Sequence, residues 1–195
     1  DLCVEREGVF RQAIEAIRVA KAAGFQVCTN TTVYRETDMR EVEELFEYLR
    51  QFNVDAHQIS PAYGYSAIDN REIFLTREDI HEKFRDIDRL MKRYPINQTP
   101  TYMSFLQGSR ELPCTAWGNP TYNVKGWKGP CYLITDAHYR TFEELMTRTP
   151  WESYGPGNDP RCEHCMVHCG FEPSAALGIN ARAGDGIRLL SWMLR

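Results

Sequence analysis

Five cysteines in the C-terminal part of the chain have the residue type and spacing to hold a metal centre. They form two groups, Cys114 with Cys131, and Cys162 with Cys165 and Cys169. The first group has the form C-x11-G-x4-C and the second the form C-x2-C-x3-C. Thiolates on separate loop turns can converge on an iron–sulfur cluster, and the Gly-, Pro- and Trp-rich sequence between them is typical of loops. The spacing therefore predicts a 4Fe-4S cluster that ties this part of the chain together.

Zinc is the alternative occupant, because it accepts the same thiolates and His164 and His168 lie beside Cys162 and Cys165. Five cysteines exceed what a tetrahedral zinc site needs, which favours the cluster. One thiol is then surplus: either Cys169 does not ligate, or another of the five is a free thiol near the cluster. With either metal, distant ligands close a long loop, so the metal would contribute directly to folding.

Composition excludes several classes of protein. A net charge of -4 and a pI near 5.8 supply no basic stripe, so we expect no nucleic-acid partner. No apolar run approaches the length of about 18 residues that spans a bilayer, and no signal peptide is visible, so a cytoplasmic location is predicted. Seven cysteines without a secretory signal favour metal or thiol chemistry over disulfides. Cys3 and Cys28 stand apart, and we expect both to be ordinary buried thiols.

Hydrophobic periodicity predicts an α/β fold for the first part of the chain. Helices are expected over 7–23, 39–53 and 76–94, a buried strand over 25–34, and further strands over 54–60 and 96–99, followed by a segment at 102–106. Thr76 and Asp79 are predicted to cap the third helix. This order is typical of parallel α/β units, with only half of a barrel present. Because the sequence starts at Asp1 and enters a helix almost at once, it is expected to be a fragment.

Residues 113–176 are different in character, and we treat them as a second, irregular, cysteine-rich domain after a domain of residues 1–112. Hairpin arms are predicted at 121–124 and 132–134, and a helix at 141–149, where Thr141 and Glu144 have the spacing of a capping box. Residues 177–195 form a tail in which 187–194 could be either an amphipathic helix or a read-through segment.

Chemistry in parallel barrels takes place at the carboxyl ends of the strands and in the loops that follow. Polar and aromatic side chains occupy these positions after both main strands: Asn30, Thr31, Thr32, Gln58, Ser60, Tyr63 and Tyr65. Aromatic residues near the cysteines either shield the metal or line a slot for a bulky apolar substrate: Trp117, Tyr122, Trp127, Tyr132 and Phe171. His57 and His138 show no partner in sequence and are interpreted as structural.

Several segments closely resemble the C-terminal half of the HpnH family, the radical S-adenosylmethionine proteins of hopanoid biosynthesis known as adenosylhopane synthases. The resemblance runs from about residue 1 to residue 176, and the cysteine blocks are its specific part. The segments are Asn30-Thr31-Thr32-Val33-Tyr34, Ile59-Ser60-Pro61-Ala62-Tyr63-Gly64-Tyr65, Cys114-Thr115-Ala116-Trp117-Gly118-Asn119-Pro120, Gly126-Trp127-Lys128-Gly129-Pro130-Cys131 and Cys162-Glu163-His164-Cys165-Met166-Val167-His168-Cys169.

The resemblance implies a partial radical S-adenosylmethionine barrel followed by an auxiliary-type tail domain. The whole protein would add a 5′-deoxyadenosyl radical to the alkene of diploptene, giving adenosylhopane, and would meet this lipid at the bilayer edge. Asn30 and Ser60 match positions that contact the cofactor. The family's Cys-x3-Cys-x2-Cys cluster loop does not occur in this sequence, so this chain alone should be inactive without the first half of its barrel.

Two rival interpretations remain open. The C-x11-G-x4-C element also resembles the auxiliary-cluster domains called SPASM and twitch, which would imply a radical enzyme that modifies a peptide and has a polar, extended substrate groove. A binding module stapled by zinc, without catalysis, is the alternative from a different class. Metal content separates the zinc module from both enzymes.

Overall fold

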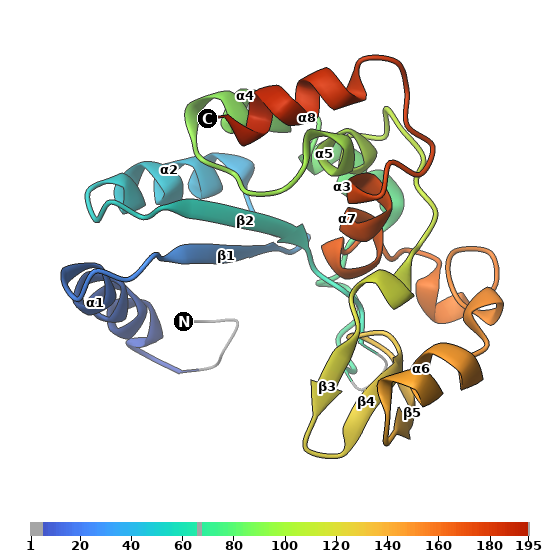
Figure 1. The fold of residues 1–195 in the computed structure, drawn as a ribbon. Coiled ribbons are helices and arrows are strands. Elements are labelled where there is room, and N and C mark those ends of the chain that lie inside the picture. Colours follow the sequence, from blue (N-terminus) through green and yellow to red (C-terminus); the bar gives the residue numbers. More distant parts are fainter. Residues whose placement is uncertain (1–5, 66–67, 195) are drawn as a thin grey trace.

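The computed structural model describes residues 6–65 and 68–194, which form a mixed α/β fold with two small sheets. The N-terminal part contains α1 (Val9–Ala22), β1 (Cys28–Val33), α2 (Met39–Arg50) and β2 (Ala56–Pro61), in the predicted order. Figure 1 shows β1 and β2 side by side, with a helix on either side of the pair. None of the helices within these residues combines the length and apolar character needed to cross a membrane.

Strands β1 and β2 run parallel, with Asn30 opposite Gln58 and Thr32 opposite Ser60. Their carboxyl ends therefore lie at the same edge of the sheet, as the α/β prediction requires. The sheet has two strands, and the strand expected at 96–99 is reduced to a single bridge between His57 and Ile96. The barrel itself thus remains a prediction.

Strand β1 is not the buried strand that its Val- and Thr-rich sequence predicts, because Val33 is its only buried residue. Helix α1 likewise buries none of its residues. Cys28 is exposed, with its Sγ accepting a hydrogen bond from Asn97 Nδ2 at 3.3 Å, so the prediction of a buried thiol is wrong. The reason is that β1 is an edge strand with no neighbour on its outer side among the described residues. Cys3 lies outside those residues.

The helix predicted over 76–94 is two helices, α3 (Arg77–Lys83) and α4 (Ile87–Arg93). The capping box at the start of α3 is confirmed, since Thr76 and Asp79 each accept a hydrogen bond from the other's backbone N–H. Residues 100–106 form a further helix, α5 (Pro100–Leu106), which begins at the N-cap Thr99.

The cysteine-rich region, residues 113–176, contains a three-stranded antiparallel sheet with the order β3 (Thr121–Asn123), β4 (Gly126–Pro130) and β5 (Thr135–Tyr139). The partner of β3 is therefore β4, and the hairpin arm predicted at 132–134 is wrong. A glycine is required at the tight turn between β3 and β4, because Gly126 has φ of 124° and a Cβ there would lie 2.5 Å from Tyr139 O.

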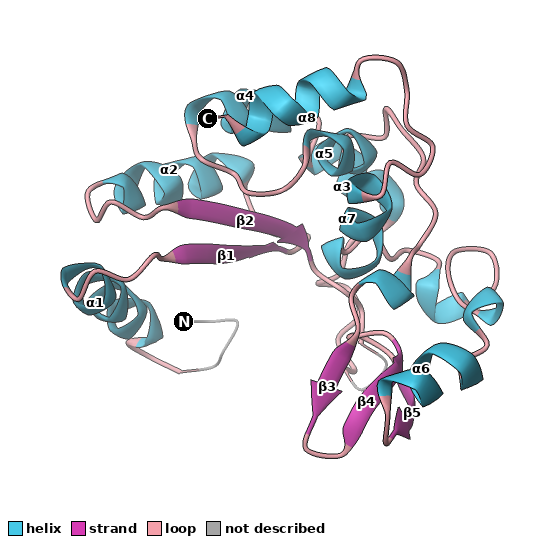
Figure 2. Ribbon diagram, viewed as in Figure 1, coloured by secondary structure: helices cyan, strands magenta, loops and turns pink. Residues whose placement is uncertain are grey.

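Helices and short 3-10 turns complete the chain: η2 (Ala116–Gly118), α6 (Phe142–Arg148), η3 (Trp151–Ser153), η4 (Pro160–Cys162), α7 (His168–Ala176) and α8 (Asp185–Met193). The capping box of Thr141 and Glu144 is confirmed at α6, and α8 confirms the predicted C-terminal helix. Figure 2 shows that long loops join these elements, and that the three strands lie apart from the parallel pair.

One hydrophobic core connects the α/β part to the cysteine-rich region. The rings of Phe105 in α5 and Phe171 in α7 stack at 4.5 Å, and both side chains are fully buried. Trp192 of α8 packs against the core and donates a hydrogen bond to Ile96 O at 2.9 Å. The residues of the core come from both predicted domains and include Val33, Phe46, Ile59, Phe84, Tyr102, Phe105, Met166, Phe171 and Ala175.

His57 illustrates how this core responds to pH. Its ring is 1% exposed, stacks on Phe46 at 4.2 Å and shares a hydrogen bond with Thr29 Oγ1 at 2.7 Å. Burial lowers the pKa of His57 from 6.5 to about 4. Between these values the unfolded chain binds a proton that the folded chain excludes, so stability falls as pH falls through this window.

We predict that His57→Gln flattens this part of the pH profile. The wild-type free energy of unfolding should drop by at most about 3 kcal/mol more than that of the variant between pH 6.5 and pH 4. Urea unfolding at a series of pH values measures the free energy of unfolding of wild type and of His57→Gln. The contributions of other titrating groups are the same in both proteins and cancel in the difference. His138→Gln, on the exposed side of β5, is the control. Parallel pH profiles for wild type and His57→Gln would contradict the prediction.

Candidate metal centre and strand-end cavity

The five cysteines come from separate segments that the fold brings together. Cys114 precedes η2, Cys131 follows β4, Cys162 ends η4, Cys165 lies in the next turn and Cys169 lies in the first turn of α7. Charge on Cys131 and Cys162 raises the pKa of Cys114 in addition to the larger effect of burial, and charge on Cys131 and Cys114 does the same at Cys169. The two sequence groups are thus within range of direct electrostatic interaction.

Helix α7 holds the Cys114 segment at very short range. Thr115 N donates to Gly170 O at 2.8 Å, and Ser174 Oγ donates to Pro113 O at 2.6 Å. A Cβ at position 170 would lie 2.5 Å from Cys114 Sγ. Because position 170 is a glycine, Cys114 can contact helix α7, which also carries Cys169.

Backbone N–H groups act on the sulfurs of all five cysteines. Ile134 N donates a hydrogen bond to Cys131 Sγ at 3.4 Å. At the other four, a backbone N–H lowers the pKa of the thiol against the larger effect of burial: Ala116 at Cys114, Gly155 at Cys162, Val167 at Cys165 and Gly170 at Cys169. Backbone hydrogen bonds to sulfur stabilise thiolate charge and are one of the features that tune protein-bound iron–sulfur clusters. The donor set therefore has the chemistry that a cluster requires.

Burial dominates the protonation of four of the thiols. It raises the pKa of Cys114 and of Cys169 to about 12, that of Cys165 well above the ordinary value, and that of Cys162 as well. These four thiols thus hold their protons at neutral pH, and a metal would have to displace the protons on binding.

Arg161 holds the segment that carries Cys162 against strand β5. Its guanidinium donates two hydrogen bonds to Asp136 of β5, both at 2.7 Å, and further bonds to Asp159. These two carboxylates raise the pKa of Arg161 further above its usual range. Tyr63 Oη also donates to Arg161 O at 3.1 Å, which joins the loop after β2 to the same segment.

In residues 6–65 and 68–194, no three His, Cys, Asp or Glu side chains form a group closed enough to hold a metal ion. The five cysteines lie near one another, but within these residues their side chains do not form a complete set of metal ligands. Metal ligation by these cysteines, and the choice between iron–sulfur and zinc, therefore remain predictions.

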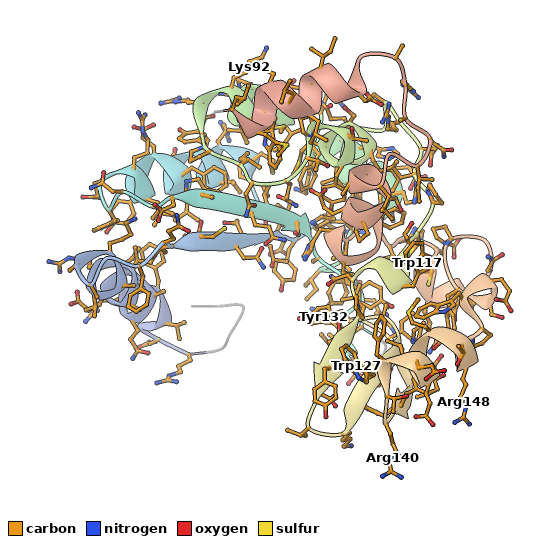
Figure 3. All side chains as sticks on the ribbon, in the orientation of Figure 1. Lys92, Trp117, Trp127, Tyr132, Arg140 and Arg148 are labelled. Atoms are coloured by element: carbon orange, nitrogen blue, oxygen red, sulfur yellow. The ribbon has the colours of Figure 1, made fainter. Side chains whose placement is uncertain are left out.

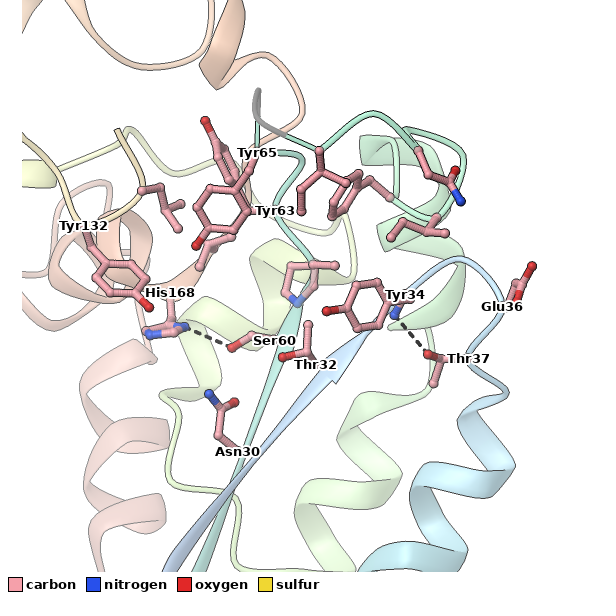
Figure 4. Close-up of a pocket in the computed structure, with 18 of the residues that line it drawn as sticks. Asn30, Thr32, Tyr34, Glu36, Thr37, Ser60, Tyr63, Tyr65, Tyr132 and His168 are labelled. Atoms are coloured by element: carbon pink, nitrogen blue, oxygen red, sulfur yellow. Dashed lines mark hydrogen bonds between the residues drawn. The ribbon is translucent and has the colours of Figure 1, made fainter. Parts of the chain in front are cut away.

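A cavity of about 1050 Å³ lies at the carboxyl ends of β1 and β2. We call it the strand-end cavity. Asn30, Thr32 and Ser60 line it from the strands, and His168 lines it from α7 (Figure 4). Ser60 is 5% exposed, and its Oγ shares a hydrogen bond with His168 Nδ1 at 2.9 Å. The two residues predicted to contact the cofactor, Asn30 and Ser60, thus lie in the same cavity.

Strand alternation explains in part which of the predicted polar residues reach this cavity. Asn30 and Thr32 are two positions apart and share a face of β1, whereas Thr31 between them points to the other face and does not line the cavity. Gln58 has the same alternation as Ser60 on β2 but also does not line the cavity, so alternation alone does not account for it. His168 was noted in sequence only as a neighbour of Cys165. Its bond to Ser60 spans 108 positions, and no local pattern signals such a contact.

Aromatic side chains form the other wall of the cavity. Tyr34, Tyr63, Tyr65 and Phe74 line it from the strand ends and the loop after β2, and Tyr132 lines it from the loop after Cys131. Burial raises the pKa of the Tyr63 phenol, and charge on Cys165, Cys162 and Cys131 adds to this effect. The wall of the cavity is therefore adjacent to the group of thiols.

A second hollow of about 510 Å³ lies beside Trp117 on the far side of His168. It also contains Glu172, whose carboxylate accepts hydrogen bonds from Thr99 N at 2.8 Å and Thr99 Oγ1 at 2.7 Å. Burial raises the pKa of Glu172 to about 7. Trp127, which was predicted either to shield the metal or to line such a slot, packs on the hairpin between Tyr122 and Phe142.

The model of the family described as Domain of unknown function (DUF3463) matches residues 57–189. The chain belongs to this family. The matched range contains Ser60, all five cysteines and every residue that lines the second hollow, but it begins after Asn30. The searches of the curated proteins and of the solved structures found no match.

The matched range thus includes the five cysteines and the part of the strand-end cavity that comes from β2, the loop after it, Tyr132 and α7. Strand β1 and the residues that follow it supply the rest of the cavity. Ser60 and His168, which share a hydrogen bond, both belong to the matched range. Such an arrangement can bind an elongated ligand with a polar end at Asn30, Thr32 and Ser60 and an aromatic end beside the thiols.

Proposed function

We propose that the chain is the C-terminal part of a radical S-adenosylmethionine enzyme of the adenosylhopane synthase type. In this proposal the strand-end cavity binds the cofactor and the cysteine-rich region holds a 4Fe-4S cluster. The observation that carries it is the cavity itself, because it unites Asn30 and Ser60 at the carboxyl ends of parallel strands and borders the thiols.

The polar end of the cavity suits the nucleoside and amino-acid parts of S-adenosylmethionine. The Asn30 amide, the Thr32 hydroxyl and the Ser60 hydroxyl offer donors and acceptors for ribose hydroxyls and a carboxylate. Glu36 and Glu41 line the same cavity, and their negative charge favours a ligand with a sulfonium and an ammonium group. His168 fixes the Ser60 hydroxyl through Nδ1.

When bound, S-adenosylmethionine would supply the adenosyl group: one electron from a reduced 4Fe-4S cluster outside this chain would release methionine. The 5′-deoxyadenosyl radical would add to the alkene of diploptene, and a further electron and a proton from an external reductant would complete adenosylhopane. The residues of this chain would orient the adenosyl group and exclude water from it. The wall formed by Tyr34, Tyr63, Tyr65 and Phe74 favours an apolar substrate over the extended peptide of the rival enzyme class.

For the cysteine-rich region, the support is the convergence of five cysteines, of which Cys162 and Cys169 are buried, together with the hydrogen bond from Ile134 N to Cys131 Sγ. The sequence contains no Cys-x3-Cys-x2-Cys loop. The proposed cluster is therefore an auxiliary one, and cleavage of the cofactor would require a separate cluster. We propose a cytoplasmic location for the whole enzyme.

We predict that Asn30→Ala and Ser60→Ala each weaken binding of S-adenosylmethionine about tenfold, because each removes a hydrogen bond to a polar ligand in a partly buried site. Isothermal titration calorimetry of the anaerobically reconstituted chain measures the dissociation constant. Asn119→Ala, in the second hollow beside Trp117, is the matched control and should bind like wild type.

Two outcomes would overturn the proposal. One is a chain that contains one zinc ion and no iron after anaerobic purification, which would favour the zinc-stapled binding module. The other is cofactor binding that is lost in Asn119→Ala but unaffected by Asn30→Ala and Ser60→Ala, since the strand-end cavity would then not be the binding site.

A further inference from the structure

The turn between β3 and β4 exposes apolar and aromatic side chains away from both hollows. Val124 is fully exposed at the turn, Tyr122 is 64% exposed and Phe142 is 46% exposed. We call residues 122–128 together with 140–142 the aromatic tip. Figure 3 shows Trp127 and Arg140 on this part of the molecule, where the small sheet extends from the rest of the fold.

Strand pairing arranges the rings of the tip as one surface. Tyr122 is directly opposite Trp127 in the β3–β4 pair, and their ring centroids are 5.2 Å apart. Trp127 also contacts Phe142 at the start of α6, at 5.3 Å. Exposed apolar surface of this kind, in a contiguous row on a rigid hairpin, marks an interaction site.

The charge around these rings is mostly positive. Lys125, Lys128 and Arg140 belong to the tip, and none of them takes part in an ion pair within the described part of the chain. Glu143 adds one negative charge next to Phe142. The neighbouring carboxylates are engaged elsewhere, Asp136 with Arg161 and Glu144 with Arg148.

We propose that the aromatic tip docks the protein on the surface of an anionic lipid bilayer. Tyr and Trp rings favour the boundary between headgroups and acyl chains, the exposed Val124 would enter it, and lysine and arginine side chains are attracted to anionic headgroups. Because the whole chain has a net charge of -4, a negative surface repels most of the molecule and selects the orientation in which the tip approaches first.

The tip is also connected to the strand-end cavity. Lys128 Nζ donates to Tyr132 O at 2.8 Å and lies 5.5 Å from the centroid of the Tyr132 ring. Tyr132 is part of the cavity wall. A docked tip would therefore bring this wall towards the membrane surface. The inference goes beyond the proposed function and does not depend on it, because docking needs neither a cluster nor a cofactor.

Helix α8 offers a second exposed apolar row and serves as the internal control. Ile187, Leu190, Met193 and Leu194 are each more than half exposed. A chain that docks through the tip should be insensitive to a charge placed on this helix. Ile187→Glu is thus matched to Val124→Glu, because both replace a highly exposed aliphatic side chain by the same carboxylate.

Co-sedimentation with sucrose-loaded vesicles tests the proposal. Vesicles of phosphatidylcholine with phosphatidylglycerol in a molar ratio of about 3:1 supply the anionic surface, and pure phosphatidylcholine vesicles supply the neutral one. We expect binding to the anionic vesicles that is weakened about fivefold in Lys125→Gln, about tenfold in Val124→Glu, and not at all in Ile187→Glu. Raising the salt concentration should weaken binding further.

The proposal is overturned if wild-type protein does not sediment with anionic vesicles, or if Ile187→Glu reduces binding while Val124→Glu does not. Equal binding of the wild type to neutral and anionic vesicles, together with unchanged binding of Lys125→Gln, would overturn the electrostatic part of the proposal. Circular dichroism of each variant shows that the fold is retained, which is expected because positions 124, 125 and 187 are on the surface. Intact cofactor binding in Val124→Glu would separate a failure of docking from a failure of the proposed function.

Discussion

Serine in place of Cys165 is expected to abolish the visible absorption of the proposed iron–sulfur cluster and to lower the iron content of the anaerobically reconstituted chain to background. Cys165 interacts with Cys114, Cys162 and Cys169, so it occupies a central position among the five thiols. A serine hydroxyl binds iron far less readily than a thiolate does. Because metal binding would supply folding energy to the cysteine-rich region, the variant should also unfold at a lower temperature than the loaded wild type.

Cys28→Ser is the matched control for this experiment. Cys28 is an exposed thiol on β1, and none of the five cysteines is among the groups that act on it. Its replacement should leave iron content and melting temperature unchanged. If Cys165→Ser alone kept its iron, Cys165 would be the surplus thiol. If Cys165→Ser and Cys114→Ser both kept their iron, or if Cys28→Ser lost iron to the same extent as Cys165→Ser, the five-cysteine centre would not be the site of the cluster.

Local sequence signals were sufficient for much of the secondary structure. Helices at 9–22, 39–50 and 142–148 follow from hydrophobic periodicity and capping residues, and the capping boxes at Thr76 and Thr141 have the predicted partners. These predictions succeed because the interactions involved span only three or four positions. The mixed α/β class follows from the order of the elements in the same way.

Predictions that depended on distant contacts were less successful. Residues 25–34 are rich in β-branched residues, but burial of β1 requires neighbours on both sides, and its outer side has none in the described residues. The hairpin partner at 132–134 failed because the glycine at 126 allows the chain to turn back earlier. Sequence likewise could not reveal that His168 would meet Ser60, or that Glu172 would bond the N-cap Thr99.

The candidate site shows the same division. The family resemblance selected Asn30 and Ser60, and strand alternation together with the parallel register places both at the strand-end cavity. The aromatic wall of the cavity was only partly predicted, because Tyr34 and Phe74 come from segments whose relative position depends on how the loop after β2 packs. Sequence spacing suggested that the five cysteines converge, but the contact of Cys114 with Gly170 could be seen only in the fold.

Phe171→Ala is expected to destabilise the whole chain by about 4 kcal/mol, since truncation of a fully buried aromatic ring leaves a cavity as well as removing apolar contacts. Phe171 is 0% exposed and stacks on Phe105 at 4.5 Å, and this contact joins α7 to α5. Helix α7 also carries Cys169 and His168, so its loosening should reach both the thiols and the bond to Ser60. Urea unfolding followed by circular dichroism measures the loss.

The matched control is Phe25→Ala, which makes the same chemical change at a position that is 65% exposed and should cost about 0.5 kcal/mol or less. A single transition that shifts to lower urea concentration in Phe171→Ala would mean that the α/β part and the cysteine-rich region unfold together, as their shared core implies. Two separate transitions, of which only one shifts, would mean that residues 1–112 fold independently. In that case the strand-end cavity, whose walls come from both parts, would form only when the two are docked.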